Sequence, residues 1–527
     1  TVNDDFFRIG GDSITAIQFA SEAKKKGLNI TSKAVFKTPI LHQLAQSILH
    51  SPQLEAYEEK SKLQVTKNFS SQKQNIKIIK NNIPHEFEEI YPLSAMQRGL
   101  LINHMQHKQY DMYFRQKVFK IRNLSSLETF EKIWFKIVQE YSIFRTVFCW
   151  QGLDEPVQVT LKEKDNFPYL FHNITNHSRE DQELYLERIL KDDKKQGFDL
   201  TCLPLFRSIL LRISECEFYF ILTFHHILLD GWSVMQILNK IKEEYVNFNE
   251  NRFSLSKKEP SFHDYLLWFN AQDKKPLENY WKKYLQGVNY NNNLLASLKY
   301  EKNRSEGYDV FKANVASTVY SELVKLSKTY GFTLNSILQF AWGVLLAKRT
   351  QSCDILFGLT IFGRTVGLEN SHNIIGLMAN TVPFRIQITG ALNIVDSIKA
   401  LQEELIVMQQ YSLLPLFEIQ TLATGSQQAS PQFDTIFIFE NYPKIEKGES
   451  TVLSIEQYNN SLDVTEFPLT VGLEPSHELI MRFGYNKMYF SENVIKKIFS
   501  DYQRILETIS LSLQQTVTDE RDSICVE

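Results

Sequence analysis

The sequence predicts an α/β protein preceded by a small unit built only from short helices. Between about residues 91 and 514, amphipathic helical stretches alternate with apolar runs of strand length, which is typical of sheets covered by helices. The first 49 residues carry small and apolar side chains at helical spacing, and Pro39 opens another short helix that ends near Leu49. The apolar positions of the earlier helix are Ile14, Ile17, Ala20 and Ala23.

A polar tract from Ser51 to about Glu88 separates these two parts. It is rich in Lys, Asn, Gln and Ser, which favours a linker, although a surface loop of one domain is the alternative. The body that follows is longer than one hydrophobic core usually spans, so we expect two lobes. The expected units are residues 1–50 (helical unit), 51–88 (linker), 89–265 (first lobe), 266–518 (second lobe, with the seam near a helix–turn–helix at 261–287) and 519–527 (tail).

Composition narrows the function classes. Hydrophobic residues make up 43% and charged residues 23%, and 58 Lys and Arg against 61 Asp and Glu leave a net charge of −3, which argues against a nucleic-acid partner. The five cysteines have no CxxC spacing and imply neither a disulfide framework nor a zinc cluster. No targeting segment opens the sequence, and its longest apolar stretch, near Ile337–Ala347, is shorter than the roughly 20 residues that span a bilayer. We therefore expect no membrane partner and a cytoplasmic location.

The strongest chemical signal is a pair of histidines, His225 and His226, at the end of an apolar strand. The segments PLFRSILLRIS and FYFILTF, joined by a short turn at 215–217, predict a β-hairpin whose second strand is buried on both faces. Because side chains alternate along a strand, adjacent histidines point to opposite sides, and only one can face a given cavity. The two residues therefore have two different roles.

The residues after the histidines predict a turn and a helix start. Asp230, Gly231 and Trp232 form the turn, and Ser233 begins a helix as a capping box with Gln236. A neutral imidazole near a helix N-terminus suits acyl transfer, since the imidazole can accept a proton while the helix end polarises a carbonyl. The alternative is that both histidines are satisfied residues of the core.

The pattern HHxxxDG between a strand and a capped helix resembles the active-site motif of condensation domains of nonribosomal peptide synthetases, within the wider chloramphenicol-acetyltransferase-like superfamily. Further segments match that family in order: YPLSAMQRGLL at Tyr91, FRTVF at Phe144, SFHDYLLW at Ser261, DILFGLTIFGRTVG at Asp354, IIGLMANTVPFR at Ile374 and FDTIFIFENYP at Phe433. The resemblance implies two chloramphenicol-acetyltransferase-like lobes in a V shape. It also implies amide bond formation between two carrier-bound thioesters, without a metal or a nucleotide.

The N-terminal segment DDFFRIGGDS resembles a peptidyl carrier domain around its phosphopantetheine site. Gly10 and Gly11 allow a sharp turn before Ser13, which would carry 4'-phosphopantetheine covalently; the alternative is an ordinary helix cap. The family's first carrier helix is absent before this segment, so we expect an incomplete all-α bundle. The implied partners are a downstream acceptor carrier, an upstream adenylation domain and a phosphopantetheinyl transferase.

The resemblance and the turn geometry together assign roles within the site. His226 would face a tunnel between the lobes as the base or positioning group, and His225, on the opposite side of the strand, would pack structurally. Gly231 would belong to the catalytic motif. Asp230 would be structural and paired with an arginine, with Arg364 as the first candidate and Arg145 as the second; an exposed turn aspartate is the alternative. Trp232, Ser233 and Asn380 would line the approaches of the substrate arms. In the family an Arg-His pair commonly precedes FRTVF, but Glu140-Tyr141 stands here, so no role of that pair transfers.

Two other functions are compatible with the same motifs. One is a starter-type or CoA-dependent acyltransferase, which the preceding carrier disfavours, and the other is a condensation-like docking domain without activity, which the intact HHxxxDG disfavours. An epimerization domain is disfavoured by GWS after the aspartate. YPLSAMQRGLL and FENYP resemble the condensation subtype that takes a D-configured donor, although no epimerization domain separates the carrier from the body.

Overall fold

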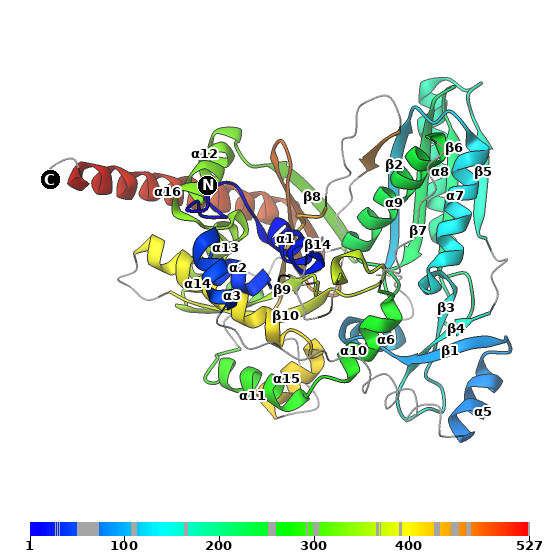
Figure 1. Cartoon of the computed structure of the whole chain (residues 1–527), viewed down its shortest axis with the longest axis horizontal. Helices are drawn as coiled ribbons and strands as arrows, with labels where there is room; N and C mark the ends of the chain where they lie inside the picture. Colours follow the sequence, from blue (N-terminus) through cyan, green and yellow to red (C-terminus); the bar gives the residue numbers. More distant parts are fainter. Residues whose placement is uncertain are drawn as a thin grey trace.

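The computed structural model describes most of the chain. The described residues are 1–26, 28, 30, 32–49, 73–106, 113–162, 167–250, 260–290, 293–298, 305–364, 368, 370–388, 393–425, 433–443, 453–459 and 465–524. The first part of the expected linker, 51–72, lies outside them, as do Cys525 and the end of the expected tail. Figure 1 shows two lobes, each with a β-sheet and covering helices, and a small group of helices from the N-terminal end.

The N-terminal unit is helical, as expected. It comprises α1 (Ser13–Lys25), α2 (Ser32–Lys37) and α3 (Leu41–Leu49), packed around a small core in which Ala16 and Val35 are buried. Gly11 must lack a side chain, because a Cβ there would lie 2.3 Å from the Phe6 ring. The helices lie against the second lobe in Figure 1.

The first lobe contains a five-stranded sheet in the order β12-β2-β7-β6-β5. The predicted hairpin is present, since β6 and β7 pair antiparallel with Phe206 opposite Phe224. Every residue of β7 after the first is buried, because β7 lies between two strands and between two layers of helices. The strands are β2 (Phe114–Arg122), β5 (Tyr169–Asn173), β6 (Phe206–Arg212), β7 (Glu217–His225) and β12 (Ser454–Asn459), and the helices are α6 (Ala95–Gln106), α7 (Leu127–Glu140), α8 (Arg179–Gln196) and α9 (Gly231–Asn249).

A three-stranded sheet completes the first lobe. Its order is β1-β4-β3, with β1 at Phe87–Pro92, β3 at Thr146–Cys149 and β4 at Val157–Leu161. Helix α5 (Lys73–Asn82) covers it by burying Ile79 among the valines of β3 and β4. The second part of the expected linker is therefore folded into this lobe, because its apolar residues recur at helical spacing within the polar background.

The second lobe is built on a six-stranded mixed sheet in the order β10-β9-β11-β13-β14-β8. The predicted helix–turn–helix at the seam is present as α10 (Phe262–Asn270) and α11 (Lys274–Tyr284). The strands are β8 (Tyr308–Asn314), β9 (Asp354–Ile361), β10 (Asn380–Gln387), β11 (Thr435–Phe439), β13 (Leu469–Pro475) and β14 (Leu479–Asn486), and the helices are α12 (Ser317–Tyr330), α13 (Leu334–Thr350), α14 (Ile394–Tyr411), α15 (Leu416–Thr424) and α16 (Glu492–Ile524).

Two features of the structure do not follow the expected units, which divide the lobes at 265/266 and begin a tail at 519. Strand β12 comes from the second half of the sequence but pairs with β2 of the first lobe, so the chain crosses between the lobes after β11. Helix α16 continues to Ile524, through most of the expected tail. Within the described residues, no single helix is long and apolar enough to cross a membrane, and only the pair α12 and α13, bent by 114°, passes that test by length and composition.

Candidate active site

The two histidines leave the end of β7 in opposite directions. The N–H of His225 donates to the Leu205 carbonyl at 3.0 Å, and the N–H of His226 donates to the Tyr113 carbonyl at 2.8 Å. Leu205 precedes β6 and Tyr113 precedes β2, which are the two neighbours of β7 in the sheet. The sheet thus fixes both backbone positions and directs the two imidazoles to opposite faces, as the alternation of a strand requires.

His225 is enclosed in the first lobe. Its side chain is fully buried, with the rings of His104, Tyr113 and Phe198 at centroid distances of 5.6, 5.9 and 6.4 Å. The Ile227 N–H donates to Nδ1 at 3.2 Å, so the neutral ring carries its proton on Nε2. Burial holds the pKa of His225 well below its usual value, and the neighbouring His104 adds to this effect. His225 is therefore a neutral packing residue.

His226 has the opposite tautomer and is only half-buried. Its Nδ1 lies 2.7 Å from the Leu229 carbonyl oxygen, and because a carbonyl can only accept, Nδ1 carries the hydrogen. In the neutral ring the basic nitrogen is then Nε2, on the far side of the imidazole. This bond fixes both the orientation and the tautomer of the ring, which is the preparation that a general base requires.

Asp230 holds the turn after the histidines. It is the N-cap of α9, where it accepts from the Ser233 N–H at 2.9 Å, and it forms a two-pronged ion pair with Arg364 at 2.7 and 2.9 Å. The N–H groups of Met378 and Ala379 donate to the same carboxylate. Burial alone would raise the pKa of Asp230, but the charge of Arg364 and the hydrogen bonds lower it overall. The expected pair with Arg364 is thus present, and it joins the two lobes.

Three expectations for neighbouring residues are wrong. Arg145 does not reach Asp230; its guanidinium pairs with Glu88 at 3.1 Å. The cap of α9 is Asp230 and not Ser233, whose hydroxyl donates to the Gly376 carbonyl at 2.8 Å and is fully buried. Ser233 therefore joins the lobes and does not line an approach.

Asn380 also has a different role from the one expected. Its side-chain N–H groups donate to the carbonyls of Ser412 and Leu414 at 2.7 and 2.8 Å, so both are already used within the second lobe. Its oxygen accepts from the N–H of Thr381. Both N–H groups of this amide donate to the backbone, so they fix a loop. The side chain has no donor left for a substrate arm.

Trp232 and Gly231 shape the start of α9. The Trp232 indole donates to the His372 carbonyl at 2.9 Å, and the Arg364 guanidinium lies 5.5 Å from its ring centre. Gly231 meets the ring of Tyr442, which would lie 2.5 Å from any Cβ added there. Tyr442 belongs to the FENYP segment, so that segment packs directly against the turn after the histidines.

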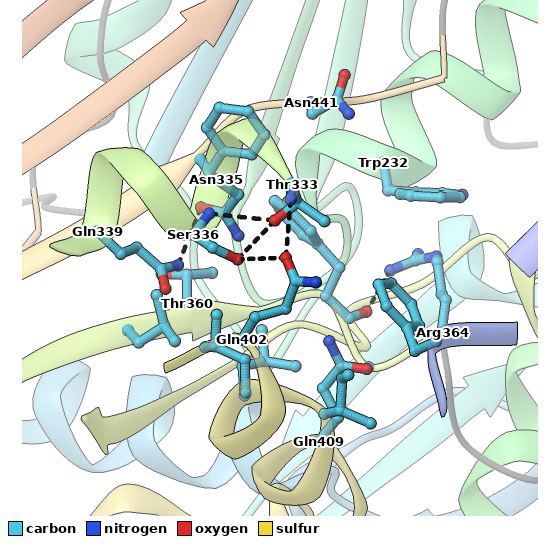
Figure 2. Close-up of a pocket in the computed structure, with 18 residues that line it drawn as sticks. Trp232, Thr333, Asn335, Ser336, Gln339, Thr360, Arg364, Gln402, Gln409 and Asn441 are labelled. Carbon is cyan, nitrogen blue, oxygen red and sulfur yellow. Dashed lines mark hydrogen bonds between the residues drawn. The ribbon is translucent and has the colours of Figure 1, made fainter. Parts of the chain in front are cut away.

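A pocket lies beside this turn, in the second lobe (Figure 2). Trp232 and Arg364 form part of its wall, and most of the remaining wall comes from α13, β9 and α14. Its polar lining residues include Asn335, Gln339, Thr360, Gln402 and Gln409. The sequence did not identify these residues, because they come from distant segments that carry no chemical motif.

The carrier-like helices contact the mouth of the same pocket. Phe36 of α2 is among the lining residues, and the side chain of Asn441, which also lines the pocket, donates to the carboxylate of Asp12 at 2.9 Å. Asp12 also caps α1 by accepting from the Thr15 N–H at 2.8 Å, and Ser13 is the first residue of that helix. The tight turn at Gly11 and the capped helix start fit a site where a prosthetic group is attached to Ser13. The residue expected to bear the arm is therefore a chain neighbour of a residue that contacts the pocket wall.

Sequence reasoning also missed a carboxyl group that contacts Tyr113. Glu466, just before β13, accepts hydrogen bonds from Tyr113 at 3.2 Å and from Asn103 of α6 at 3.4 Å. Burial raises the pKa of Glu466. Tyr113 therefore connects the backbone of His226 to a carboxyl of the second lobe. Among the described residues, no group of three or more His, Cys, Asp or Glu side chains is arranged to hold a metal ion.

Comparisons with known proteins agree with this geometry. Residues 87–521 match the family described as Condensation domain, and residues 1–48 match the Phosphopantetheine attachment site. A linear gramicidin synthase protein of Brevibacillus parabrevis is 30% identical over 437 residues, and bacitracin synthase 3 of Bacillus licheniformis is 27% identical over 447. These matches cover 82% and 84% of this chain but only 6% and 7% of those proteins.

The fold has a counterpart among solved structures. A four-domain nonribosomal peptide synthetase bound to AMP and glycine superposes with a TM-score of 0.66 at 17% identity, over 81% of this chain and 33% of that one. At this identity the likeness concerns the fold, and it agrees with the two-lobed α/β architecture predicted from the sequence. With the match over residues 87–521, it follows that this chain belongs to the condensation domain family and carries a phosphopantetheine attachment region before that domain.

Proposed function

We propose that this chain forms an amide bond between a donor acyl thioester carried at Ser13 and the amine of an aminoacyl thioester on a downstream carrier. The single observation that supports this most is the fixed imidazole of His226, whose Nδ1 donates to the Leu229 carbonyl and leaves Nε2 as the basic nitrogen. The 4'-phosphopantetheine of the attachment region supplies the thiol that holds the donor acyl group.

The reaction requires little acid–base chemistry. The acceptor amine attacks the thioester carbonyl, a C–N bond forms, the C–S bond breaks, and the amine proton is transferred so that the sulfur leaves as a thiol. Nε2 of His226 accepts that proton or orients the amine by accepting its hydrogen bond. Much of the remaining acceleration would come from holding the two reactants together.

Asp230 acts on the reaction only through the protein. Its carboxylate is occupied by Arg364, by two backbone N–H groups and by the α9 cap, so it has no role as a proton acceptor. Because it ties the turn after His226 to the second lobe, it fixes the position of the histidine at the junction between the lobes. We assign Asp230 and Arg364 as positioning residues.

The proposed partners follow from the same reading. The donor would be loaded by an upstream adenylation domain after a phosphopantetheinyl transferase has modified Ser13, and the acceptor would arrive on a downstream carrier in the cytoplasm. We also propose a D-configured donor residue, on the resemblance of YPLSAMQRGLL and FENYP to that subtype. The contact between Tyr442 of FENYP and Gly231 puts one of these two segments beside the turn after His226.

The test is mass spectrometry of the products. The chain, loaded at Ser13 with an aminoacyl pantetheine arm, is mixed with a candidate aminoacyl carrier, and a dipeptidyl thioester on the acceptor is the expected product. Ser13→Ala should remove product from the tethered donor but not from a soluble aminoacyl pantetheine donor. Product from free acyl-CoA but not from the loaded carrier would contradict the proposal in favour of a CoA-dependent acyltransferase. Loading with D- and L-aminoacyl arms in parallel tests the stereochemistry, and faster product formation from the L-donor would contradict it.

A further inference from the structure

One of the buried polar side chains that line the pocket is Gln339, on α13. It is 1% exposed, and its Nε2 donates to the Asn335 side chain at 2.9 Å. Its Oε1 has no hydrogen-bond partner among the described residues, although a buried amide oxygen without a partner destabilises a protein. Because Gln339 is one of the residues that line the cavity, a ligand bound there can supply the missing donor.

The polar groups near Gln339 are engaged with other partners. The hydroxyl of Ser336 pairs with Thr333 and with the Gln402 oxygen, and Figure 2 shows this cluster on the same side of the pocket. The two terminal nitrogens of Arg364 are occupied by Asp230, and a guanidinium can only donate. Gln339 therefore keeps a buried acceptor in this pocket for a ligand.

The position of the pocket indicates which ligand reaches it. Phe36 and Asn441 line it, and Asn441 binds Asp12, the residue before Ser13. Trp232 and Arg364 line it as well, and they belong to the structure that holds the turn after His226. A ligand between these two sets of residues comes from the arm attached to Ser13, so it belongs to the donor side of the reaction.

The size and walls of the pocket restrict the ligand further. The cavity has a volume of about 100 Å³, and Leu359, Ile361 and Phe439 contribute apolar surface to it. Such a space suits a side chain of modest size with one polar group directed at Gln339. A hydroxyl group meets the free amide oxygen most simply, because it carries a donor on a short, uncharged side chain.

We propose that this pocket selects the donor residue and favours a small hydroxyl-bearing side chain, such as that of threonine, through a hydrogen bond to Gln339. This inference rests on the proposed function, in which the donor acyl group arrives from Ser13. A pocket that pairs a buried polar atom with a substrate hydroxyl disfavours the isosteric apolar substrate, because the protein atom is then left without a partner. Threonine and valine are such a pair.

Binding is measured with soluble pantetheine analogues in which an amide replaces the thioester, so that no reaction is needed. Calorimetry should show that the threonyl analogue binds about tenfold or more tightly than the valyl analogue. Gln339→Met keeps the length of the side chain but removes its hydrogen-bonding atoms, and it should bring the two affinities to within about twofold. Gln410→Met, on the exposed face of α14, is the matched control and should keep the wild-type preference.

The outcomes separate this proposal from the proposed function. Equal affinity for the two analogues in the wild type would overturn the pocket assignment, as would a preference that survives Gln339→Met in a protein with unchanged thermal unfolding. Equal weakening of both analogues by Gln339→Met would mean that Gln339 contacts the shared pantetheine and would also overturn it. A threonine preference in binding, without dipeptidyl product from any donor, would support the pocket and contradict the proposed reaction.

Discussion

The junction between the lobes and the junction between the carrier-like helices and the second lobe are built from different chemistry. Between the lobes, the ion pair of Asp230 and Arg364 is buried, with side chains 2% and 0% exposed. Strand β12 also follows β11 of the second lobe along the chain but pairs with β2 of the first lobe. At the carrier junction, the contacts of the described residues include a hydrogen bond between Asp12 and Asn441, both only half-buried, and Phe36 lines the same pocket as Asn441.

This difference fits the work that each junction would do. A buried charge pair loses most of its stabilisation if either partner moves away, so it holds one arrangement. A single hydrogen bond at a partly exposed surface contributes only about 0.5–1.5 kcal/mol and can be released and formed again. The ion pair thus holds the lobes so that His226 keeps its position, while the contact between Asp12 and Asn441 can be released without exposing a buried charge.

The largest effect is expected from breaking the lobe junction. Asp230→Ala leaves Arg364 charged and buried without its partner, and we expect a loss of about 3–5 kcal/mol in the free energy of unfolding. Denaturant titration followed by fluorescence measures it. The double replacement Asp230→Leu with Arg364→Leu should be less destabilising than Asp230→Ala alone, since it leaves no uncompensated charge.

An exposed ion pair is the control for that experiment. Lys132 and Glu128 lie one helical turn apart on α7, with side chains 65% and 76% exposed. Glu128→Gln should leave the unfolding transition unchanged, because water screens this pair. Equal unfolding free energies for Asp230→Ala and the wild type would contradict the assigned role of the buried pair.

Substitutions of the two histidines should affect different properties, which are activity for His226 and stability for His225. His226→Ala should lower amide formation by about 10²–10⁴-fold without changing the melting temperature, since its loss removes a proton acceptor at a half-buried position. His225→Ala should instead lower the melting temperature, because it empties a buried position and removes the acceptor of the Ile227 N–H. Product formation and thermal unfolding are measured on both variants, and equal loss of activity at unchanged melting would remove the distinction.

Glu466 provides a smaller and pH-dependent test of the lobe junction. Burial raises its pKa in the folded protein, so the unfolded chain releases this proton at a lower pH than the folded one. The contribution of Glu466 to the free energy of unfolding therefore becomes less favourable as the pH rises above 4.5, the ordinary pKa of a glutamate carboxyl. Glu466→Gln keeps an acceptor for Tyr113 and removes the charge, so it should be more stable than the wild type at pH 8, with the difference vanishing below about pH 4. Parallel unfolding curves across this pH range check the sign.

The sequence predicted the lobe junction better than the carrier junction. Asp230 and Arg364 both lie in recognisable motifs, and the rule that a buried carboxylate needs a cation connects them. The same reasoning failed for Arg145, which lies in another motif but pairs with Glu88. Two capping residues stand in the turn, and the sequence does not tell which one caps α9, so Ser233 was assigned wrongly. Asn380 was misassigned because its partners, the carbonyls of Ser412 and Leu414, are set by the tertiary fold.

The sequence could not predict the pocket. Phe36, Trp232, Gln339 and Asn441 come from four distant segments, and only the fold brings them together. Gln339 lies within an apolar helix, where the period of the pattern predicts burial but not a cavity. The fold class was easier to predict, because few architectures agree with alternating helices and strands that carry many motifs in this order.

The smallest effect is expected from the carrier junction, and it concerns only the tethered donor. Asp12→Ser keeps a residue that can cap α1, but its hydroxyl is too short to replace the carboxylate that accepts from Asn441. Loss of one such hydrogen bond should lower transfer from the Ser13-tethered donor by about 2- to 10-fold and leave transfer from a soluble pantetheine donor unchanged. Asn441→Ala in the Asp12→Ser background should cause no further loss that is specific to the tethered donor, because the shared contact is already absent. Rates with both donors for the two single variants and the double variant complete the cycle. Additive losses would show that the two residues act independently and that the contact does not guide the carrier.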